Sequence, residues 1–268
     1  MTTVSNFQIL ALNNAQTSEN RIHSDDTAAK YGFEGALVSG ANIFGYLSQP
    51  LVRHYKENWL SSGIMDVIFL KPAYQENLLT IKTEELSSEY SQRNHLTGAY
   101  NEKDILIAKL ESWVPKQLPS INVLADLYRE PEDVERKEIH WDLISVNQPW
   151  PSHRWGPTET DNQERVGAQR DQAELYQGPE GFIHPYYLLE ACNKTLMRQF
   201  ILPAWIHTGS RLVIRKPLQA GQEIEVRAIP IEKWEHKGHQ FIKLYVAMMI
   251  QGEAAIEVEH TAIFHIAT

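Results

Sequence analysis

The chain has 268 residues, of which 43% are apolar, and a formal net charge of −9 at pH 7. This length and composition allow a full hydrophobic core, in one large domain or two smaller ones. The negative charge opposes binding to the phosphates of DNA or RNA, so we expect no nucleic-acid partner. No apolar run approaches the roughly 20 residues that span a bilayer, and the N-terminus lacks the pattern of a signal peptide, so we expect a cytoplasmic protein without a membrane partner.

The spacing of cysteine and histidine argues against a metal centre. The single cysteine, Cys192, excludes an internal disulfide and any zinc site built from several cysteines. The histidines are numerous, but no pair has the HxxxH or HExxH spacing that binds zinc on a helix. The sequence therefore predicts no metal and no cofactor.

In chain order, the first strong pattern is a helix over residues 41–58. Its apolar residues recur every three or four positions, as burial of one helix face requires, and Pro50 predicts a kink within it. Residues 116–177, further on, are rich in proline and polar residues and are interpreted as a linker. Between the helix and this linker, alternating apolar residues predict strands at Met65–Leu70, Leu78–Glu84 and Ile105–Val114.

A second series of one helix and several strands follows the linker. Apolar residues at helical spacing predict a helix over residues 185–202, and Pro185 suits its first turn. Alternating apolar residues then predict strands at Arg211–Arg215, Glu223–Ile231, Gln240–Ile250 and Ala254–His265.

The two series are copies of one unit. Trp59 begins WLSSGIMDVIFLKPAYQENLLTIKTEE, and Trp205 begins WIHTGSRLVIRKPLQAGQEIEVRAIPIE, with an offset of 145 residues at the Lys-Pro pairs. A long helix followed by an antiparallel meander, twice over, predicts an α+β double hotdog, in which a sheet wraps around a central helix in each copy. We expect an N-terminal hotdog at 1–115, the linker at 116–177 and a C-terminal hotdog at 178–268.

The stretch TSENRIHSDDTAAKYGFEGALVSG, residues 17–40, places an asparagine and a histidine ahead of the first helix. It resembles the signature of MaoC-like hotdog hydratases and dehydratases, and the whole chain resembles their double-hotdog subgroup of acyl dehydratases. The positions that match the signature are Asn20, Ile22, His23, Ala28, Ala29, Gly32, Phe33, Val38 and Gly40.

Three positions depart from that signature. Ser18, Arg21 and Ser39 stand where the family has aspartate, proline and histidine. In the family, the aspartate and the motif histidine jointly hold a water for addition to a 2-enoyl thioester, while a backbone N–H at the helix start polarises the carbonyl. A serine hydroxyl is too weak a base to replace the carboxylate near neutral pH, so the two-residue mechanism is not available as it stands.

The resemblance implies catalytic roles for Asn20, His23 and the backbone of Gly40. Imidazole titrates near physiological pH, and a helix N-terminus offers free N–H groups and the positive end of the helix dipole. Glu19 is the expected substitute for the aspartate, because its longer side chain compensates for a displacement of one position. Asp25 and Asp26 also lie close in sequence, but they suit the acidic first turn of a helix better.

The second copy adds candidates that the fold would bring to the same channel, between the two central helices. His207 is a further catalytic candidate, with stacking beside Trp205 as its structural alternative. His184 and Glu190 are either substrate-binding or structural, as a helix cap and a solvated helix residue. The substrate-binding candidates from both copies are Ser18, Ser39, His184, Glu190, Ser210 and Arg211.

These residues predict an acyl-thioester lyase, which hydrates a 2-enoyl-CoA or 2-enoyl carrier-protein thioester or dehydrates a 3-hydroxyacyl thioester. One alternative is an acyl-CoA thioesterase that uses Glu190 or another carboxylate to activate water at the carbonyl. Another is an acyl-binding or cyclising protein that does not add water. The expected partner is an acyl-CoA or acyl-carrier-protein substrate, and a homodimer of double hotdogs stays open.

Overall fold

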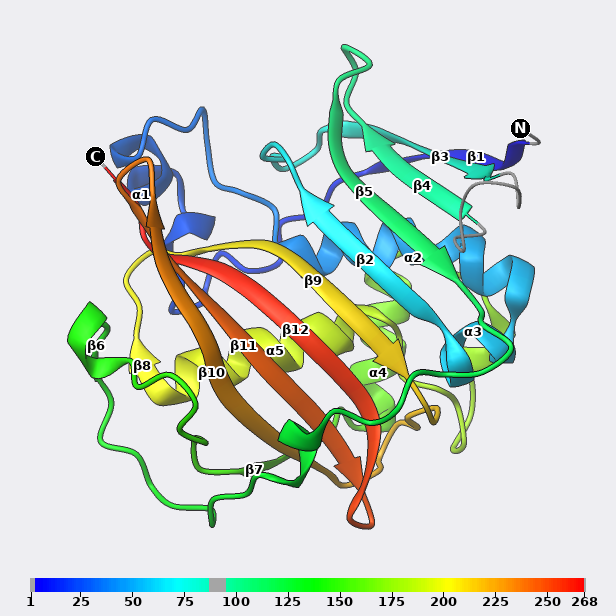
Figure 1. The fold of residues 1–268 in the computed structure, drawn as a ribbon. Coiled ribbons are helices and arrows are strands. Elements are labelled where there is room, and N and C mark those ends of the chain that lie inside the picture. Colours follow the sequence, from blue (N-terminus) through cyan, green and yellow to red (C-terminus); the bar gives the residue numbers. More distant parts are fainter. Residues whose placement is uncertain (1–2, 87–94, 268) are drawn as a thin grey trace.

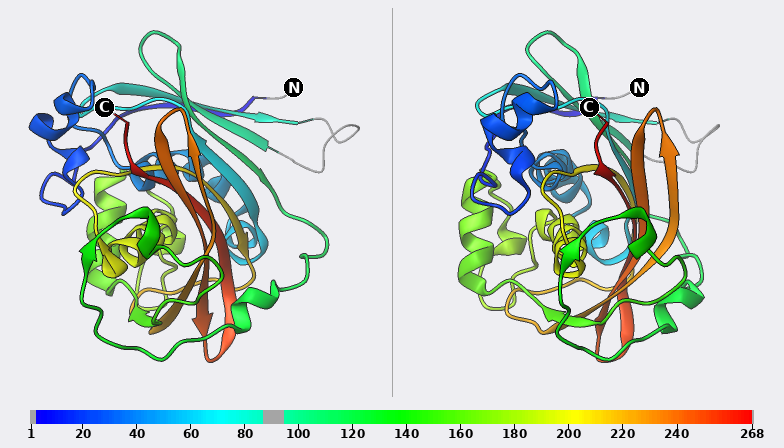
Figure 2. Two further views of the ribbon diagram at one scale, coloured as in Figure 1. Left: turned by 60° about the vertical axis from the view of Figure 1, so that its left-hand side comes forward. Right: turned by 90° about the vertical axis from the view of Figure 1, so that its left-hand side faces the viewer.

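A computed structural model describes residues 3–86 and 95–267 of the chain. Within these residues one large antiparallel sheet, of ten strands, runs in the order β1-β3-β4-β5-β2-β9-β12-β11-β10-β7. The sheet curves around two long helices, α2 and α5, which lie against its inner face (Figures 1 and 2). The described part contains no helix long and apolar enough to cross a membrane.

The N-terminal half supplies the first five strands of that order. A short 3-10 helix, Arg21–His23, and three α-helices interrupt its strands. The elements are β1 Thr3–Leu10, α1 Asp25–Lys30, α2 Gly40–Tyr55, α3 Glu57–Ser62, β2 Ile64–Phe69, β3 Leu78–Glu85, β4 His95–Tyr100 and β5 Leu106–Trp113.

The C-terminal half supplies the other five strands. It also carries a small parallel sheet of β6 and β8, and 3-10 turns at Val123–Asp126, Trp141–Leu143 and Glu174–Tyr176. The elements are β6 Lys137–Glu138, β7 His153–Trp155, α4 Glu159–Ala168, α5 Tyr186–Gln199, β8 Phe200–Ile201, β9 Ile206–Ile214, β10 Ile224–His236, β11 His239–Ile250 and β12 Glu253–His265.

The two halves join through strands β2 and β9, which lie side by side in the middle of the sheet (Figure 1). Ile64 pairs with Val213, and Ile68 pairs with Gly209. With the repeat offset of 145 residues, Gly209 is the counterpart of Ile64, and Val213 is the counterpart of Ile68. Each isoleucine therefore pairs with the counterpart of the other isoleucine. The two halves are therefore related by an approximate two-fold axis, as the predicted double hotdog requires, and the predicted fold class is confirmed.

Helix α2 is a central helix rather than a surface one. Every residue from Ala41 to Val52 is buried, so the helix needs a partner on all sides. Its buried polar side chains are satisfied: Asn42 donates to the Leu12 carbonyl at 2.7 Å, and Gln49 donates to the Gln169 carbonyl at 2.8 Å. The helix runs through Pro50 and stops at Lys56, whose φ is 53°.

Most predicted strands and both central helices appear within a few residues of their predicted bounds. Strand β9 begins five residues before the predicted Arg211, because IHTGS lacks the alternation of apolar residues that indicates a strand. Strand β4 was not predicted from its pattern, because Gly98 interrupts it. A Cβ there would lie 2.7 Å from the Tyr100 ring, so any other residue would require that ring to move.

The segment predicted as a linker is partly regular. It contains α4, and β7 pairs with β10 at the edge of the sheet, as β1 pairs with β3 at the opposite edge. The boundaries at residues 115 and 178 stay a prediction, since strand pairing by itself does not divide the chain at these positions.

Candidate active site

A cavity of about 240 Å³ lies where the motif segment, the start of α2 and the beginning of β9 meet. Both halves of the chain line it, and its polar lining includes Asn20, His23, Ser39, Gly40 and His207. A small apolar cluster of Ile22, Ala28 and Leu37 with Ala204 and Ile266 fixes the motif segment against the C-terminal half. The structure thus brings together all but one of the catalytic candidates named from the sequence.

The ring of His23 has a defined orientation. Its Nδ1 lies 2.7 Å from the carbonyl oxygen of Leu37, which can only accept, so Nδ1 carries the hydrogen. Nε2 is then an acceptor, and Nδ2 of Asn20 lies 3.4 Å away, where it can donate to it. Burial lowers the pKa of His23 below its usual value, and the hydrogen bond to Leu37 opposes that shift. His23 is therefore neutral at physiological pH and can take a proton.

Asn20 ties the motif segment to the C-terminal half. Its Oδ1 accepts from the backbone N–H of Trp205 at 3.1 Å, and its Nδ2 donates to the carbonyl of Trp205 at 3.0 Å. Ser18 also contacts Asn20, since the Oγ of Ser18 accepts from the backbone N–H of Asn20 at 3.2 Å. Ser18 does not line the cavity, so its place in the motif is structural.

The start of α2 offers a free donor to the cavity. Ser39 caps the helix by accepting from the N–H of Ala41 at 3.3 Å, whereas the N–H of Gly40 has no hydrogen-bond partner among the described residues. A Cβ on Gly40 would lie 3.1 Å from the ring of Phe69 and 3.2 Å from Nδ1 of His207. Glycine at this position therefore lets the start of α2 approach the two rings closely.

His207 ends a buried chain of three polar side chains. Its Nε2 lies 2.9 Å from Oγ of Ser210, and that Oγ lies 3.0 Å from Nδ1 of His260. Burial lowers the pKa of His207 to about 3 and holds the pKa of His260 well below its usual value. Both rings are neutral, so the Ser210 hydroxyl donates to one of them and accepts from the other. Nδ1 of His207 is buried without a partner among the described residues, on the side of Gly40.

Two acidic candidates lie outside the cavity. The carboxylate of Glu19 is paired with Arg136, whose hydrogen bond lowers the pKa of Glu19, and it faces a separate surface groove. Glu190 forms an ion pair of 2.8 Å with Lys194 in another groove. Among the described residues, no aspartate or glutamate lines the cavity. The expected carboxylate substitute is therefore missing from the lining.

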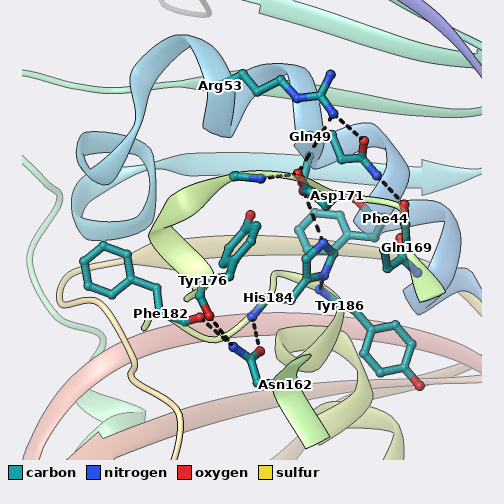
Figure 3. A network of polar contacts seen from close by, with 12 residues as sticks. Phe44, Gln49, Arg53, Asn162, Gln169, Asp171, Tyr176, Phe182, His184 and Tyr186 are labelled. Carbon is teal, nitrogen blue, oxygen red and sulfur yellow. Dashed lines mark hydrogen bonds and ion pairs between the residues drawn. The ribbon is translucent and has the colours of Figure 1, made fainter. Parts of the chain in front are cut away.

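His184 and Arg211 also lie elsewhere. Arg211 is on the outer face of the sheet, 3.1 Å from Asp66. His184 is buried between the central helices, with Nε2 of its ring 3.4 Å from Oδ2 of Asp171 (Figure 3). The backbone N–H of His184 donates to Oδ1 of Asn162 (Figure 3). Burial lowers the pKa of His184, and Asp171 opposes that shift.

The polar network around His184 continues across the helices. Asp171 also pairs with Arg53 of α2 at 4.0 Å, and Arg53 donates to Gln49 at 3.1 Å (Figure 3). These groups link α2 to the segment that precedes α5. Their position indicates a structural role.

Three residues of the site escaped the sequence reasoning. His260 faces Ser210 across the β9–β12 pair, a relationship that appears only once the register is known. Asn193 of α5 lines the cavity, and its Oδ1 is buried without a partner among the described residues. Lys71, in the repeated Lys-Pro pair, lines the cavity and is exposed to solvent.

Several solved structures have the same fold along their whole length. The chain aligns over 100% of its length with 97% of a MaoC domain protein dehydratase from Chloroflexus aurantiacus J-10-fl, at 11% identity and a TM-score of 0.68. It aligns over 98% of its length with 96% of a conserved hypothetical protein with a double hotdog fold from Mycobacterium tuberculosis, at 11% identity and a TM-score of 0.65.

A third structure with this fold is described as an oleoyl thioesterase from Lactobacillus plantarum. It shares 9% identity and a TM-score of 0.52, with 98% of each chain covered. No model of a known protein family matches the sequence, and no curated protein matches it either. The likenesses confirm the double hotdog fold, which the chain shares with structures described as a dehydratase and as a thioesterase.

Proposed function

We propose that the protein is an acyl-thioester lyase, which adds water to a 2-enoyl thioester or removes it from a 3-hydroxyacyl thioester in this cavity. The observation that carries the proposal is that His23, Gly40 and His207 line one cavity. Nε2 of His23 carries no hydrogen, and the N–H of Gly40 and Nδ1 of His207 have no partner among the described residues. The first group can accept a proton, and the other two can hold a carbonyl oxygen. The substrate class is an acyl chain on CoA or on a carrier protein.

Gly40 and His207 together form the proposed oxyanion site. The thioester carbonyl oxygen accepts from the N–H of Gly40 at the positive end of α2, where charge that develops during water addition is stabilised without reorganisation. Nδ1 of His207 lies 3.2 Å from the Cβ position of Gly40, so a hydrogen there can reach the same oxygen. A neutral imidazole suits this role, and the pKa of about 3 keeps His207 neutral.

Ser210 and His260 determine which nitrogen of His207 carries the hydrogen. When Nδ1 of His260 donates to Ser210, the Ser210 hydroxyl donates to Nε2 of His207, and the hydrogen of His207 remains on Nδ1. Neither Ser210 nor His260 lines the cavity, so both are positioning residues in this mechanism.

His23 carries out the proton transfers. Its Nε2 takes a proton from water while the water oxygen bonds to the β-carbon and the π electrons move to the carbonyl oxygen. The imidazolium then returns that proton to the α-carbon as the carbonyl re-forms. Asn20 orients the water through Nδ2, which lies 3.4 Å from Nε2 of His23. One imidazole on one side of the substrate gives syn addition, and the reaction needs no carboxylate.

Thioester hydrolysis is less well supported. The carboxylate predicted to activate water, Glu190, is paired with Lys194 in a separate groove. The described lining of the cavity contains no other carboxylate that could take its place. The chemistry of the lining residues therefore favours proton transfer by imidazole.

The test uses the purified full chain with crotonyl-CoA and longer 2-enoyl-CoAs. Loss of the conjugated enoyl absorbance without release of thiol is the expected result. Release of thiol would instead identify a thioesterase, and neither signal would indicate an acyl-binding protein. Glu19→Gln is the matched control, because its carboxylate lies outside the cavity, and it should retain the wild-type rate.

A further inference from the structure

The cavity is too small to enclose a carrier-bound substrate. Its volume of about 240 Å³ lies below the roughly 300–1,000 Å³ of pockets that bury drug-sized ligands. The reacting carbons must lie inside, next to His23 and Gly40. The part of the substrate that passes through the opening is therefore the carrier arm, and residues at the rim contact it.

Two rim residues are Leu70, whose exposed fraction is 49%, and Lys71, which is exposed. Their counterparts in the repeat are Arg215 and Lys216. The backbone has the same geometry in both copies. The N–H groups of Leu70 and Lys71 donate to one carbonyl, that of Ile107, at 2.7 and 3.1 Å. Those of Arg215 and Lys216 donate to the carbonyl of Ala255 at 2.8 and 3.1 Å.

The charge partners differ between the two copies. Lys216 is paired with Glu253, two residues before Ala255. The residue two positions before Ile107 is Ile105, which cannot pair with a lysine and whose exposed fraction is 38%. Lys71 has no ion pair among the described residues. The N-terminal copy thus combines at the rim of the cavity a lysine without an ion pair among the described residues and the exposed side chain of Leu70.

We infer that Lys71 binds the phosphate of a phosphopantetheine arm at the mouth of the cavity, with Leu70 beside the apolar part of the arm. Lysine binds phosphate as a point charge, and an unpaired lysine has no carboxylate to displace first. CoA and the prosthetic group of carrier proteins both carry this phosphate. This inference rests on the proposed function, because it places the thioester inside the cavity.

Position along the chain supports this assignment. Gly40 packs against the ring of Phe69, and Lys71 follows two residues later, in the bend just after β2. The lysine side chain then reaches outward from the rim.

The test compares two ligands that differ only in the phosphate, butyryl-4′-phosphopantetheine and butyryl-pantetheine. Binding of each is measured by calorimetry on the full chain. The saturated chain cannot be hydrated, so the measurement does not depend on lyase activity. We expect the wild-type protein to prefer the phosphorylated ligand by about tenfold, which corresponds to roughly 1.4 kcal/mol.

The variants are Lys71→Met and its counterpart in the repeat, Lys216→Met. Lys71→Met should lose the preference, Lys71→Arg should retain it, and Lys216→Met should behave as wild type. An unchanged preference in Lys71→Met, or an equal loss in Lys216→Met, would overturn the inference. Butyryl-CoA and a butyryl carrier protein, measured with the same variants, show which source of the arm depends on Lys71. Absence of enoyl hydration alongside these results would contradict the proposed reaction and not the phosphate site.

Discussion

Asn20 holds the backbone of Trp205 at both its N–H and its carbonyl, across 185 positions of sequence. This contact joins the segment that carries His23 to the strand that carries His207. Together with the small apolar cluster around Ile22, the Asn20 amide therefore sets the geometry of the cavity. Asn20→Ala should leave both backbone groups of Trp205 buried without partners and lower the free energy of unfolding by about 2 kcal/mol.

Urea denaturation measures this change, and enoyl-CoA hydration by the folded variant should fall as well. Asn101→Ala serves as the control, because Asn101 accepts from turn residues in an exposed loop. If Asn20→Ala had the same free energy of unfolding as the wild-type protein, the contact with Trp205 would not contribute to stability and the prediction would be wrong.

The pH dependence of hydration should follow His23. Only neutral His23 can accept a proton, so kcat/KM should rise with pH through the pKa of the free enzyme and then level off. Burial lowers that pKa, so the midpoint should lie below the usual 6.5 of imidazole. His207, with a pKa of about 3, should not contribute a limb near neutrality. His23→Ala should reduce kcat about 100- to 10,000-fold, and its residual activity should lack the acidic limb.

Ser210 should act on kcat without contacting the substrate. Ser210→Ala removes the hydroxyl between His207 and His260, so His207 is no longer held with its hydrogen on Nδ1. We expect a fall in kcat of about tenfold at nearly constant KM, corresponding to roughly 1.4 kcal/mol of transition-state stabilisation. Ser210→Thr keeps a hydroxyl and should recover most of the rate. Equal losses in the two variants would indicate a packing role alone.

Gly40→Ala should impair hydration. Its Cβ would lie 3.1 Å from the Phe69 ring and 3.2 Å from Nδ1 of His207, so these rings must shift by a few tenths of an ångström. Alanine keeps the backbone N–H, but the shift misaligns the two proposed oxyanion donors, so kcat should fall, by at most the roughly 100- to 1,000-fold that loss of one donor costs, in steady-state hydration assays. The control is Gly167→Ala in α4, where a Cβ meets no atom within 4 Å. That variant should be active and at least as stable as the wild-type protein.

The His184 network should affect stability and leave hydration kinetics unchanged. Asp171→Asn removes the carboxylate that faces His184 and Arg53 between the central helices. We expect a lower melting temperature with wild-type kcat and KM at a temperature where the variant is folded. A selective loss of kcat would place His184 in the chemistry instead.

The sequence predicted the fold well because its strongest signals are local and repeated. Helical spacing located α2 and α5, and the duplicated tryptophan segments located β2 and β9, the two strands that join the halves. The motif also located His23 and Gly40, whose roles depend on local backbone geometry. These features can be predicted from the sequence without knowing which strands pair.

The remaining parts of the site depend on contacts between distant segments. His260 becomes relevant only through its register with Ser210, and Asn193 only through the packing of α5 against the cavity. Glu19 was the expected base because it is close in sequence, but Arg136, 117 positions away, holds its carboxylate outside. Proximity in sequence therefore identified the motif and not the groups that complete it.

Asp66 of β2 and Arg211 of β9 pair directly, and the approximate two-fold axis maps each of these residues onto the other. Their side chains form an ion pair where the two halves join. If two N-terminal halves paired through the same strand, Asp66 would face a second Asp66. Two C-terminal halves would likewise set Arg211 against Arg211. The charges on β2 and β9 therefore favour pairing of one half with the other half over pairing of two identical halves. Produced as separate chains, the two halves should assemble with each other. The covalent link between them would then not be needed for correct pairing.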